Sequence, residues 1–431
     1  MSEAFLHYLW QFQYFDKNEL KTTTGETIQI FNPGYRNADA GPDFHTSRIR
    51  IADVEWVGST EIHIQASGWM EHRHDLDPAY ENVVLHVVWK NDKAIKRSDG
   101  SLLPTLELMN RVDRKFFRDY QRLVNSPETI PCAPFLPQVR DITKFSMIDK
   151  VLMGRLEIKA ARIFETLHKN HNDWQETCYQ LLARSFGFKV NADPFQQLAQ
   201  LLPYKILRRH GDKVLHFEAL LFGQAGFLEE DVDDAYYCLL KREYNLLRQK
   251  YTLSDRRLNK TQWKFLRLRP ANFPTIRLAE FAALLFKWPN LFSIMLETET
   301  FEELFSIFSV KQSEYWSSHY RFFKNAKETV NFLGESSIST IIINTVVPLL
   351  VAYGKSKDDQ RYVDRAVSIL QQAPGESNSI ITQWKTLGLK SKTAFDSQAL
   401  IELQNNYCTK RRCLDCTIGV SLINPRRQWP Q

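Results

Sequence analysis

The spacing of hydrophobic residues changes along the chain, and this change constrains the fold more than any other feature. In the first ~110 residues, strand-like patterns dominate, as in Arg48–Ile51, where charged and apolar residues alternate. Val83–Trp89 is almost continuously apolar, as expected of a central strand covered on both faces. From Asp141 onward the spacing becomes helical. The chain should therefore join a sheet-containing part to a mostly helical part.

We predict an α+β protein with four parts. An N-terminal mixed-sheet domain covers residues 1–125, and a proline-rich linker covers 126–140. A large all-α domain follows over 141–400, and a C-terminal segment with a cysteine knuckle covers 401–431. A length of 431 residues is enough for two or three domains of about 150 residues each.

The expected elements follow from these patterns. In the N-terminal part we expect a short aromatic helix, a hairpin turn at Ala52–Asp53 and a second short helix at Ala66–Met70. The expected strands are Thr27–Phe31, Arg48–Ile51, Val54–Val57, Thr60–Gln65 and Asn82–Trp89. The expected helices are Leu6–Phe15, Phe145–Leu167, Trp174–Phe186, Pro194–Arg209, Val214–Phe222, Asp231–Tyr251, Leu278–Leu285, Glu299–Phe308, Ile338–Tyr353 and Asp358–Gln372.

Charge and targeting signals place few limits on partners. The formal net charge of +6 is compatible with a nucleic-acid partner but does not require one. The first residues lack the basic and apolar regions of a signal peptide, and the apolar run Ser337–Tyr353 is broken by polar residues and Pro348. We therefore expect a cytoplasmic protein with no membrane partner and with reduced cysteines. The sequence does not specify an oligomeric state.

Two carboxylates of the N-terminal part are expected to meet. Asp43 follows a Gly-Pro pair, whereas Glu61 and His63 lie two apart on one strand and so share a face, which Gln65 extends. A hairpin at Ala52–Asp53 would fold Asp43 back beside Glu61. Two converging carboxylates repel each other unless a hard cation such as Mg²⁺ or Mn²⁺ lies between them.

In these residues the chain resembles the PD-(D/E)XK nuclease superfamily. Pro42-Asp43 matches the first half of its motif, and Glu61-Ile62-His63 matches the second, with histidine in the usual place of lysine. The resemblance covers residues 1 to about 110 and implies a restriction-endonuclease-like fold and a metal-dependent phosphodiesterase. Asp43 and Glu61 would hold the metal, His63 would act at the reacting phosphate, and Glu3 on the first helix would assist.

The whole chain also resembles an uncharacterised bacterial family of about this length. The resemblance implies no activity. It rests on the phrases NADAGPDF, GSTEIH, HRHDLD, LRPANFPTIRLA and YCTKRRCLDCTIG.

Histidines offer a second kind of metal site in the same region. His72 and His74 form a His-X-His pair near Asp75 and Asp77, and such a group can bind Zn²⁺. Alternatively, the pair lies on a polar face before a turn, and His86, within the apolar strand, is a core residue. The zinc alternative requires His72 or His74 to point inward toward another ligand.

Cysteines suggest a further metal site. Cys408, Cys413 and Cys416 have spacings typical of a partial metal site, and Cys132 would supply a fourth ligand if the C-terminus folds back. The pattern is similar to that of superfamily nucleases with an iron–sulfur cluster, although the spacing differs. Spacing alone does not separate Zn²⁺ from a cluster, and three reduced thiols packed at a helix start are the alternative.

A basic and aromatic segment is the last candidate. Arg267, Arg269 and Arg277 are interleaved with aromatic residues over 263–279, a chemistry suited to nucleic-acid contact. An interdomain joint, with arginines bound to backbone carbonyls, is the alternative that we favour.

The leading hypothesis is a metal-dependent nuclease-like or nucleic-acid-binding protein. It requires Asp43 and Glu61 to lie close enough to share a cation and to face a groove lined by Lys or Arg. The alternatives are a non-catalytic scaffold or adaptor with a degenerate nuclease fold, and a zinc-dependent hydrolase that uses the histidines.

Overall fold

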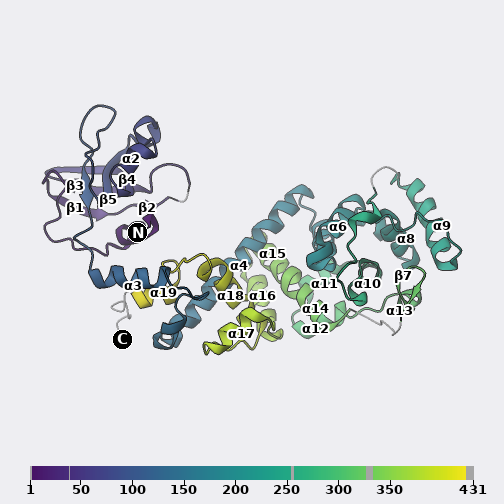
Figure 1. Ribbon diagram of the computed structural model, residues 1–431. Coiled ribbons are helices and arrows are strands. Elements are labelled where there is room, and N and C mark those ends of the chain that lie inside the picture. Colours follow the sequence, from purple (N-terminus) through teal and green to yellow (C-terminus); the bar gives the residue numbers. More distant parts are fainter. Residues whose placement is uncertain (1, 38, 254–256, 327–332, 424–431) are drawn as a thin grey trace. The chain divides into compact units, whose positions relative to one another are not determined.

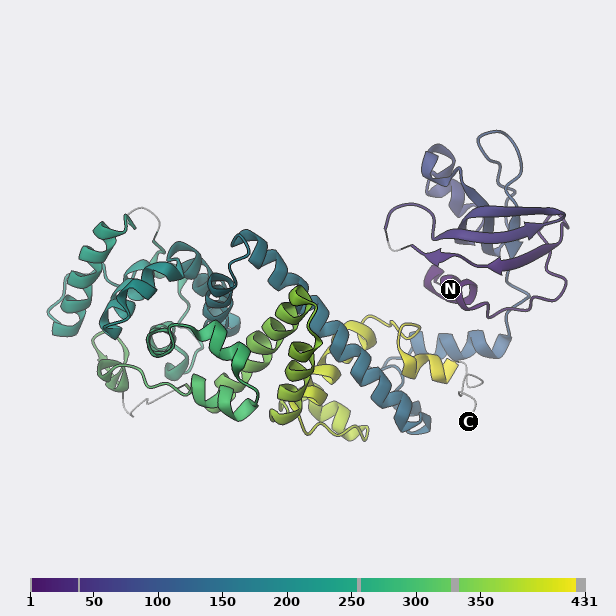
Figure 2. The ribbon, with the colours of Figure 1, turned by 180° about the vertical axis from the view of Figure 1, so that it is seen from behind.

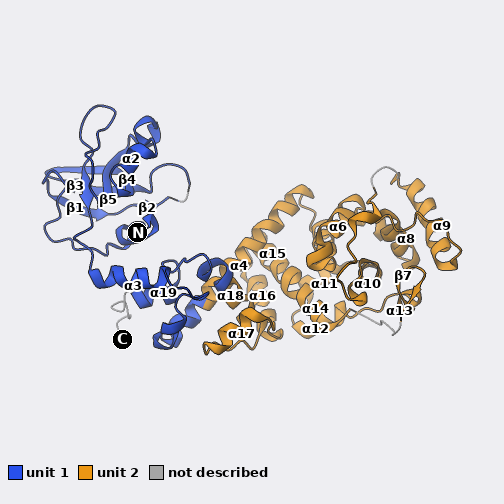
Figure 3. Ribbon diagram, in the orientation of Figure 1, with its two compact units in different colours: residues 1–147, 403–431 blue, residues 148–402 orange. Residues whose placement is uncertain are grey.

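The computed structural model describes residues 2–37, 39–253, 257–326 and 333–423 (Figure 1). The chain divides into two compact units (Figure 3). Unit 1 combines residues 1–147 with 403–431, and unit 2 consists of residues 148–402. The expected linker at 126–140 therefore lies inside unit 1, and the C-terminal segment belongs to the same unit as the N-terminal sheet. The α+β class expected from the sequence is confirmed.

Unit 1 is built on a mixed sheet. Its strands run in the order β1-β3-β4-β5-β6, and β2 also pairs with β3. The β1–β3 and β3–β4 pairs are antiparallel, whereas the β4–β5 and β5–β6 pairs are parallel. The strands are β1 (Ile28–Asn32), β2 (Tyr35–Arg36), β3 (Phe44–Ile51), β4 (Val54–Gln65), β5 (Val83–Lys90) and β6 (Thr105–Glu107).

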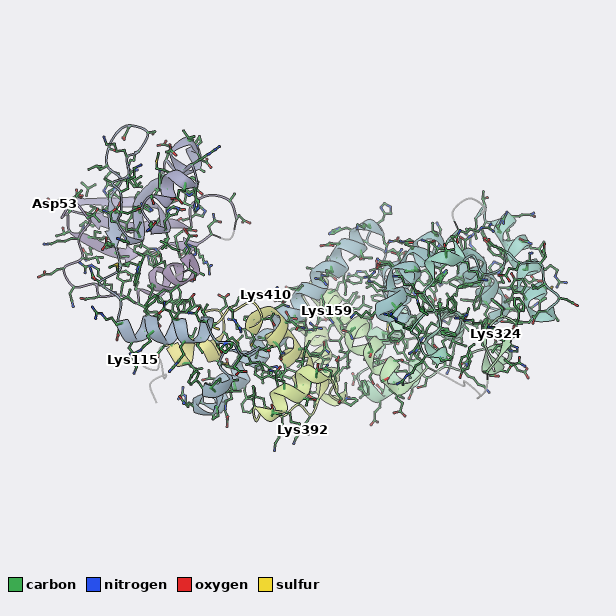
Figure 4. The ribbon with its side chains drawn as sticks, in the orientation of Figure 1. Asp53, Lys115, Lys159, Lys324, Lys392 and Lys410 are labelled. Carbon is green, nitrogen blue, oxygen red and sulfur yellow. The ribbon has the colours of Figure 1, made fainter. Side chains whose placement is uncertain are left out.

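The hairpin between β3 and β4 forms where the sequence predicts it. Ala52 adopts a left-handed φ of 50° in the turn, and Asp53 projects at the exposed tip (Figure 4). The two strands predicted at Val54–Val57 and Thr60–Gln65 are one strand, because Gly58 does not interrupt the ladder. A Cβ at Gly58 would meet the carbonyl of Asn82 at 2.6 Å, so glycine allows the neighbouring chain to approach.

Helices cover the sheet and close unit 1. Helix α1 (Glu3–Phe12) packs on β4, and the indole of Trp10 donates to the carbonyl of Pro33 at 2.9 Å (Figure 2). Phe5 stacks on Tyr120 of α3 (Arg114–Val124), with 4.3 Å between ring centroids. The C-terminal helix α19 (Thr417–Ile423) packs against α3, as Figure 1 shows.

Unit 2 is helical apart from a hairpin of β7 (His319–Arg321) and β8 (Lys324–Asn325) among its described residues. Helix α4 begins in unit 1 and continues into unit 2, and α18 ends at the first residue of the returning C-terminal segment. The helices from α4 onward are α4 (Asp141–Lys169), α5 (Trp174–Phe186), α6 (Phe188–Leu201), α7 (Tyr204–Leu207), α8 (Val214–Gln224), α9 (Ala235–Lys250), α10 (Pro274–Lys287), α11 (Leu291–Glu297), α12 (Phe301–Phe308), α13 (Glu314–Ser318), α14 (Glu335–Ile341), α15 (Val347–Lys357), α16 (Gln360–Gln372), α17 (Ser379–Thr386) and α18 (Ala394–Leu403).

Two predicted helices are divided at prolines. The helix expected over Pro194–Arg209 is split, because Pro203 separates α6 from α7. The apolar helix expected over Ile338–Tyr353 contains a π-helical turn at Ile342–Val346, directly before Pro348. The described helix over Glu335–Lys357 is long and apolar enough to cross a membrane, but 72% of its most apolar stretch is buried inside the protein.

A buried carboxyl lies in the core of unit 2. Glu218 on α8 is only 1% exposed, and its Oε2 accepts a hydrogen bond of 2.7 Å from the hydroxyl of Tyr236 on α9. Trp316 in turn donates to this hydroxyl at 3.1 Å. Burial raises the pKa of Glu218 from 4.5 to about 7. The folded protein therefore holds a proton there that the unfolded chain loses above its ordinary pKa.

We predict that Glu218→Gln removes this pH dependence. A raised carboxyl pKa destabilises the folded state as pH rises from 4.5 through about 7. The free energy of unfolding of the wild type should therefore fall, relative to that of the variant, by about 3 kcal/mol between pH 4.5 and 8. Chemical denaturation across this range measures the difference. Glu165→Gln, at an exposed position of α4, is the control. A wild type and Glu218→Gln with parallel pH profiles would contradict the assignment.

Candidate functional site

The two carboxylates predicted to meet do lie side by side. The register of the hairpin pairs Phe44 with Thr60, so Asp43 and Glu61 are next to each other across the two strands. The backbone N–H of Asp43 donates to Oε2 of Glu61 at 3.0 Å, and the N–H of Ile62 donates to Oδ2 of Asp43 at 3.0 Å. Each side chain is thus oriented by the backbone of the opposite strand.

Two histidines lie beside this carboxylate, and a third contacts one of them. Oε1 of Glu61 lies 3.3 Å from Nε2 of His74 and 3.8 Å from Nε2 of His63. Nε2 of His63 lies 3.2 Å from Nδ1 of His72. Nitrogen atoms of the three imidazoles all lie within 4.8 Å of one another. The nuclease-like and histidine-rich features of the sequence therefore form a single cluster, which we call the His–Glu cluster (Glu61, His63, His72, His74).

The segment after β4 brings His72 and His74 to this point. The short helix α2 (Gly68–Glu71) turns back toward His63, and a Cβ at Gly68 would meet the imidazole of His63 at 2.8 Å. Arg73 then adopts a left-handed φ of 61°, which directs the chain into a 3₁₀ turn that begins at His74. His74 consequently packs inward, which meets the requirement of the zinc alternative, whereas His72 is exposed and brings its Nδ1 to Nε2 of His63.

Aromatic rings hold His74 in place. The ring of Tyr80 stacks on the imidazole at 3.8 Å between centroids, and Trp69 packs edge-on against it at 5.5 Å. Nε2 of His74 is buried and has no hydrogen-bond partner among the described residues, although Oε1 of Glu61 is nearby. An unpartnered buried nitrogen with a fixed ring is a suitable metal ligand.

His86 supports His63 from the neighbouring strand. It lies opposite Glu61 in the β4–β5 register, is fully buried, and its Nε2 is 2.9 Å from Nδ1 of His63. Burial lowers the pKa of His63 to about 2 and that of His86 to about 3, so both rings are neutral at pH 7. If Nδ1–H of His63 donates to His86, the lone pair of His63 Nε2 faces the cluster. A neutral His63 suits a ligand better than the charge-stabilising role expected at the lysine position.

Burial also changes the pKa of Glu61, the carboxylic acid of the cluster. Glu61 is 5% exposed, and burial is the main cause that raises its pKa above the ordinary value. The nearby charge of Asp43 raises it further, whereas the close contact with His74 lowers it. By contrast, His72 is exposed and the Asp43 side chain is 25% exposed, so the cluster reaches the protein surface on that side.

Helix α1 contributes a histidine that the sequence reasoning missed. Nε2 of His7 lies 3.1 Å from Oδ2 of Asp43. The sequence pointed to Glu3 for the helix contribution, but Glu3 lies one helical turn earlier and His7 makes this contact. The sequence did offer one signal for this contact, because His7 is a polar residue on an otherwise apolar face of α1. Gln65 lies at the exposed end of β4, two residues beyond His63 on the same face.

The arginines of the basic segment lie in unit 2. Arg267 and Arg269 are exposed. Arg277 is not available for nucleic-acid contact, because it is 4% exposed and donates to Oε2 of Glu280 at 2.8 Å. Its guanidinium also lies over the ring of Phe188. This part of the prediction is corrected: Arg277 has a structural role inside the helical unit.

The four cysteines predicted as ligands come together in unit 1. They are 7% exposed each and line one pocket. The C-terminal segment does fold back onto the segment around Cys132. These residues are Cys132, Cys408, Cys413 and Cys416.

Fold and site together define an α+β protein with a cluster of three histidines and a buried carboxylate. The sequence model of a family described as "Protein of unknown function (DUF2851)" matches residues 3–379, nearly the whole chain. The chain belongs to this family, in agreement with the whole-chain resemblance seen in the sequence. No curated protein and no solved structure matches the chain.

We predict that Gly68→Ala destabilises unit 1. The new Cβ would lie 2.8 Å from Cδ2 of His63, so either α2 or the imidazole must move. Such overpacking costs about 1–3 kcal/mol of unfolding free energy. Gly154→Ala on α4 is the matched control, because nothing lies within 4 Å of its Cβ, and it should gain about 0.5–1 kcal/mol. Denaturant unfolding measures both, and equal effects would refute the proposed contact between α2 and His63.

Proposed function

We propose that unit 1 is a metal-dependent hydrolase domain and that His63, His72 and His74 bind its divalent ion. The observation that carries the proposal is the convergence of three imidazole nitrogens within 4.8 Å. Ligand atoms 2.0–2.1 Å from a tetrahedral zinc ion stand about 3.3 Å apart. The 3.2 Å between His63 and His72 fits this geometry.

The ligand types favour zinc over magnesium. Imidazole nitrogens suit zinc and other transition metals, whereas Mg²⁺ prefers oxygen ligands. Three protein ligands leave a position open for water or substrate, as catalytic zinc sites require. A bound ion there would supply Lewis acidity at neutral pH. The exposed His72 leaves this position accessible from solvent.

Glu61 and Asp43 have different roles in the proposal. Oε1 of Glu61 faces the nitrogens of His63 and His74, where it can accept a proton from an attacking water. The backbone of Asp43 fixes the other oxygen of Glu61, and the Asp43 side chain binds the backbone of Ile62. Asp43 is therefore a positioning residue and Glu61 is the general base.

The substrate class that we propose is the phosphodiester of a nucleic acid. It rests on the resemblance of Pro42-Asp43 and Glu61-Ile62-His63 to the PD-(D/E)XK motif. The adjacent positions of Asp43 and Glu61 in the β3–β4 hairpin support this reading. The net charge of +6 is compatible with it.

The metal assignment predicts a zinc-binding defect in His74→Ala. Chelator-treated protein, reloaded with zinc and freed of excess ion, should hold one zinc ion fewer per chain in this variant than in the wild type. His45→Ala is the matched control, because His45 is an exposed histidine of β3 outside the cluster. Elemental analysis gives the counts. Equal zinc contents in the wild type and in both variants would exclude the site.

The base assignment predicts a separation of binding from activity. Glu61→Gln should retain zinc but lose at least about 100-fold in kcat on single-stranded DNA, RNA or bis(p-nitrophenyl) phosphate. Glu55→Gln, at the outer end of the same strand, should keep wild-type kcat. A zinc-loaded wild type that cleaves none of these phosphodiesters would refute the substrate class. Full turnover by Glu61→Gln would refute the role of Glu61.

A further inference from the structure

The four buried cysteines of unit 1 form a second candidate site, separate from the proposed hydrolase centre. Cys132 lies within the proline-rich segment, whereas the other three lie nearly 300 residues later in the chain. None of the four is part of a disulfide among the described residues, and they share one pocket with Pro131, Tyr407 and Gly419. The segment around Cys132 and the C-terminal segment are distant in the sequence, and specific contacts bring them together here.

Arg411 fastens the C-terminal loop to the segment that leads to Cys132. Its guanidinium donates to the carbonyls of Ser126 at 2.9 Å and Glu128 at 2.8 Å. Arg411 has a left-handed φ of 54°, and its backbone N–H donates to the carbonyl of Cys408 at 3.1 Å. The loop is therefore folded tightly between Cys408 and Cys413.

The third and fourth cysteines are placed by the start of α19. The N–H of Thr417 contacts Sδ of Met147 at 3.3 Å, and the N–H of Val420 donates to the carbonyl of Cys416 at 2.8 Å. A Cβ at Gly419 would lie 2.3 Å from the carbonyl of Cys413, so only glycine permits this approach. The backbone thus holds the thiols around the pocket without filling it.

The thiols interact with one another electrostatically. Burial raises the pKa of Cys132 to about 12, and the thiolates of Cys416 and Cys413 raise it further. Burial and the thiolates of Cys416, Cys132 and Cys413 likewise raise the pKa of Cys408.

The spacing of the sulfurs distinguishes the kind of centre. Four thiolates 2.3 Å from one zinc ion would stand about 3.8 Å apart. Among the described residues, the groups of three ligand atoms within 4.8 Å of one another are His63–His72–His74 and His210–Asp212–His216, and neither includes a cysteine. The four sulfurs do not form one of these close groups. A [4Fe–4S] cluster binds each of four thiolates to a different iron, so it accepts sulfurs that lie further apart than the ligands of a single ion.

We propose that Cys132, Cys408, Cys413 and Cys416 are the four ligands of an iron–sulfur cluster. The cluster joins the N-terminal and C-terminal segments of unit 1. The positive charge of Arg411 lies beside it and offsets part of the negative charge of the thiolates. This inference does not depend on the proposed hydrolase activity, because the His–Glu cluster shares no residue with it.

Purification of the full chain without oxygen tests the proposal directly. We expect iron and acid-labile sulfide in equal amounts, about four of each per chain, with broad visible absorption. Cys132→Ser and Cys416→Ser should each lose most of the iron, whereas Cys238→Ser, at an exposed position of α9, should retain it.

The measurement on the wild type does not depend on whether the variants fold. One zinc ion bound by these cysteines without iron would overturn the cluster assignment. Iron-free protein whose four thiols all react with a thiol reagent after anaerobic reconstitution with iron and sulfide would overturn it as well. Because zinc at the His–Glu cluster is lost in His74→Ala and iron here is lost in Cys132→Ser, the failure of one site is distinguishable from the failure of the other.

Discussion

Two hydrogen bonds across the β3–β4 hairpin determine the geometry of the candidate site. The backbone of Asp43 holds the carboxylate of Glu61, and the carboxylate of Asp43 holds the backbone of Ile62. Glu61 can therefore present its remaining oxygen in one direction only, toward His63 and His74. The parallel strand β5 then places His86 behind His63. A change in register by one residue would turn all of these side chains to the other face of the sheet.

A bound cation would stabilise the buried carboxylate of the cluster. Imidazole rings meet nitrogen to nitrogen at His63–His86 and His63–His72, and each contact needs an N–H on one of the two nitrogens. A carboxylate buried beside them keeps its charge only at a desolvation cost. A divalent ion would accept nitrogen lone pairs and balance this charge.

Much of the fold, and the centre of the site, could be predicted from the sequence. Hairpin register follows from a short turn and an alternating pattern, so the meeting of Asp43 and Glu61 could be predicted. The approach of His72 and His74 to His63 could not be predicted, because it depends on the left-handed Arg73 and on Gly68, which local periodicity does not reveal. His7 was missed because helix-to-strand contacts are long-range. Arg277 was named as a candidate for nucleic-acid contact, although the structural role that we favoured for this segment had a partner in Glu280, three residues later on the same helix.

The proposed binding of a transition-metal ion by the His–Glu cluster can be tested with crystals grown with zinc and measured on both sides of the zinc absorption edge. We expect an anomalous peak about 2.0–2.1 Å from Nε2 of His63, Nδ1 of His72 and Nε2 of His74. A map with no peak there, in which the three imidazoles bond only to Glu61, to His86 and to one another, would contradict it.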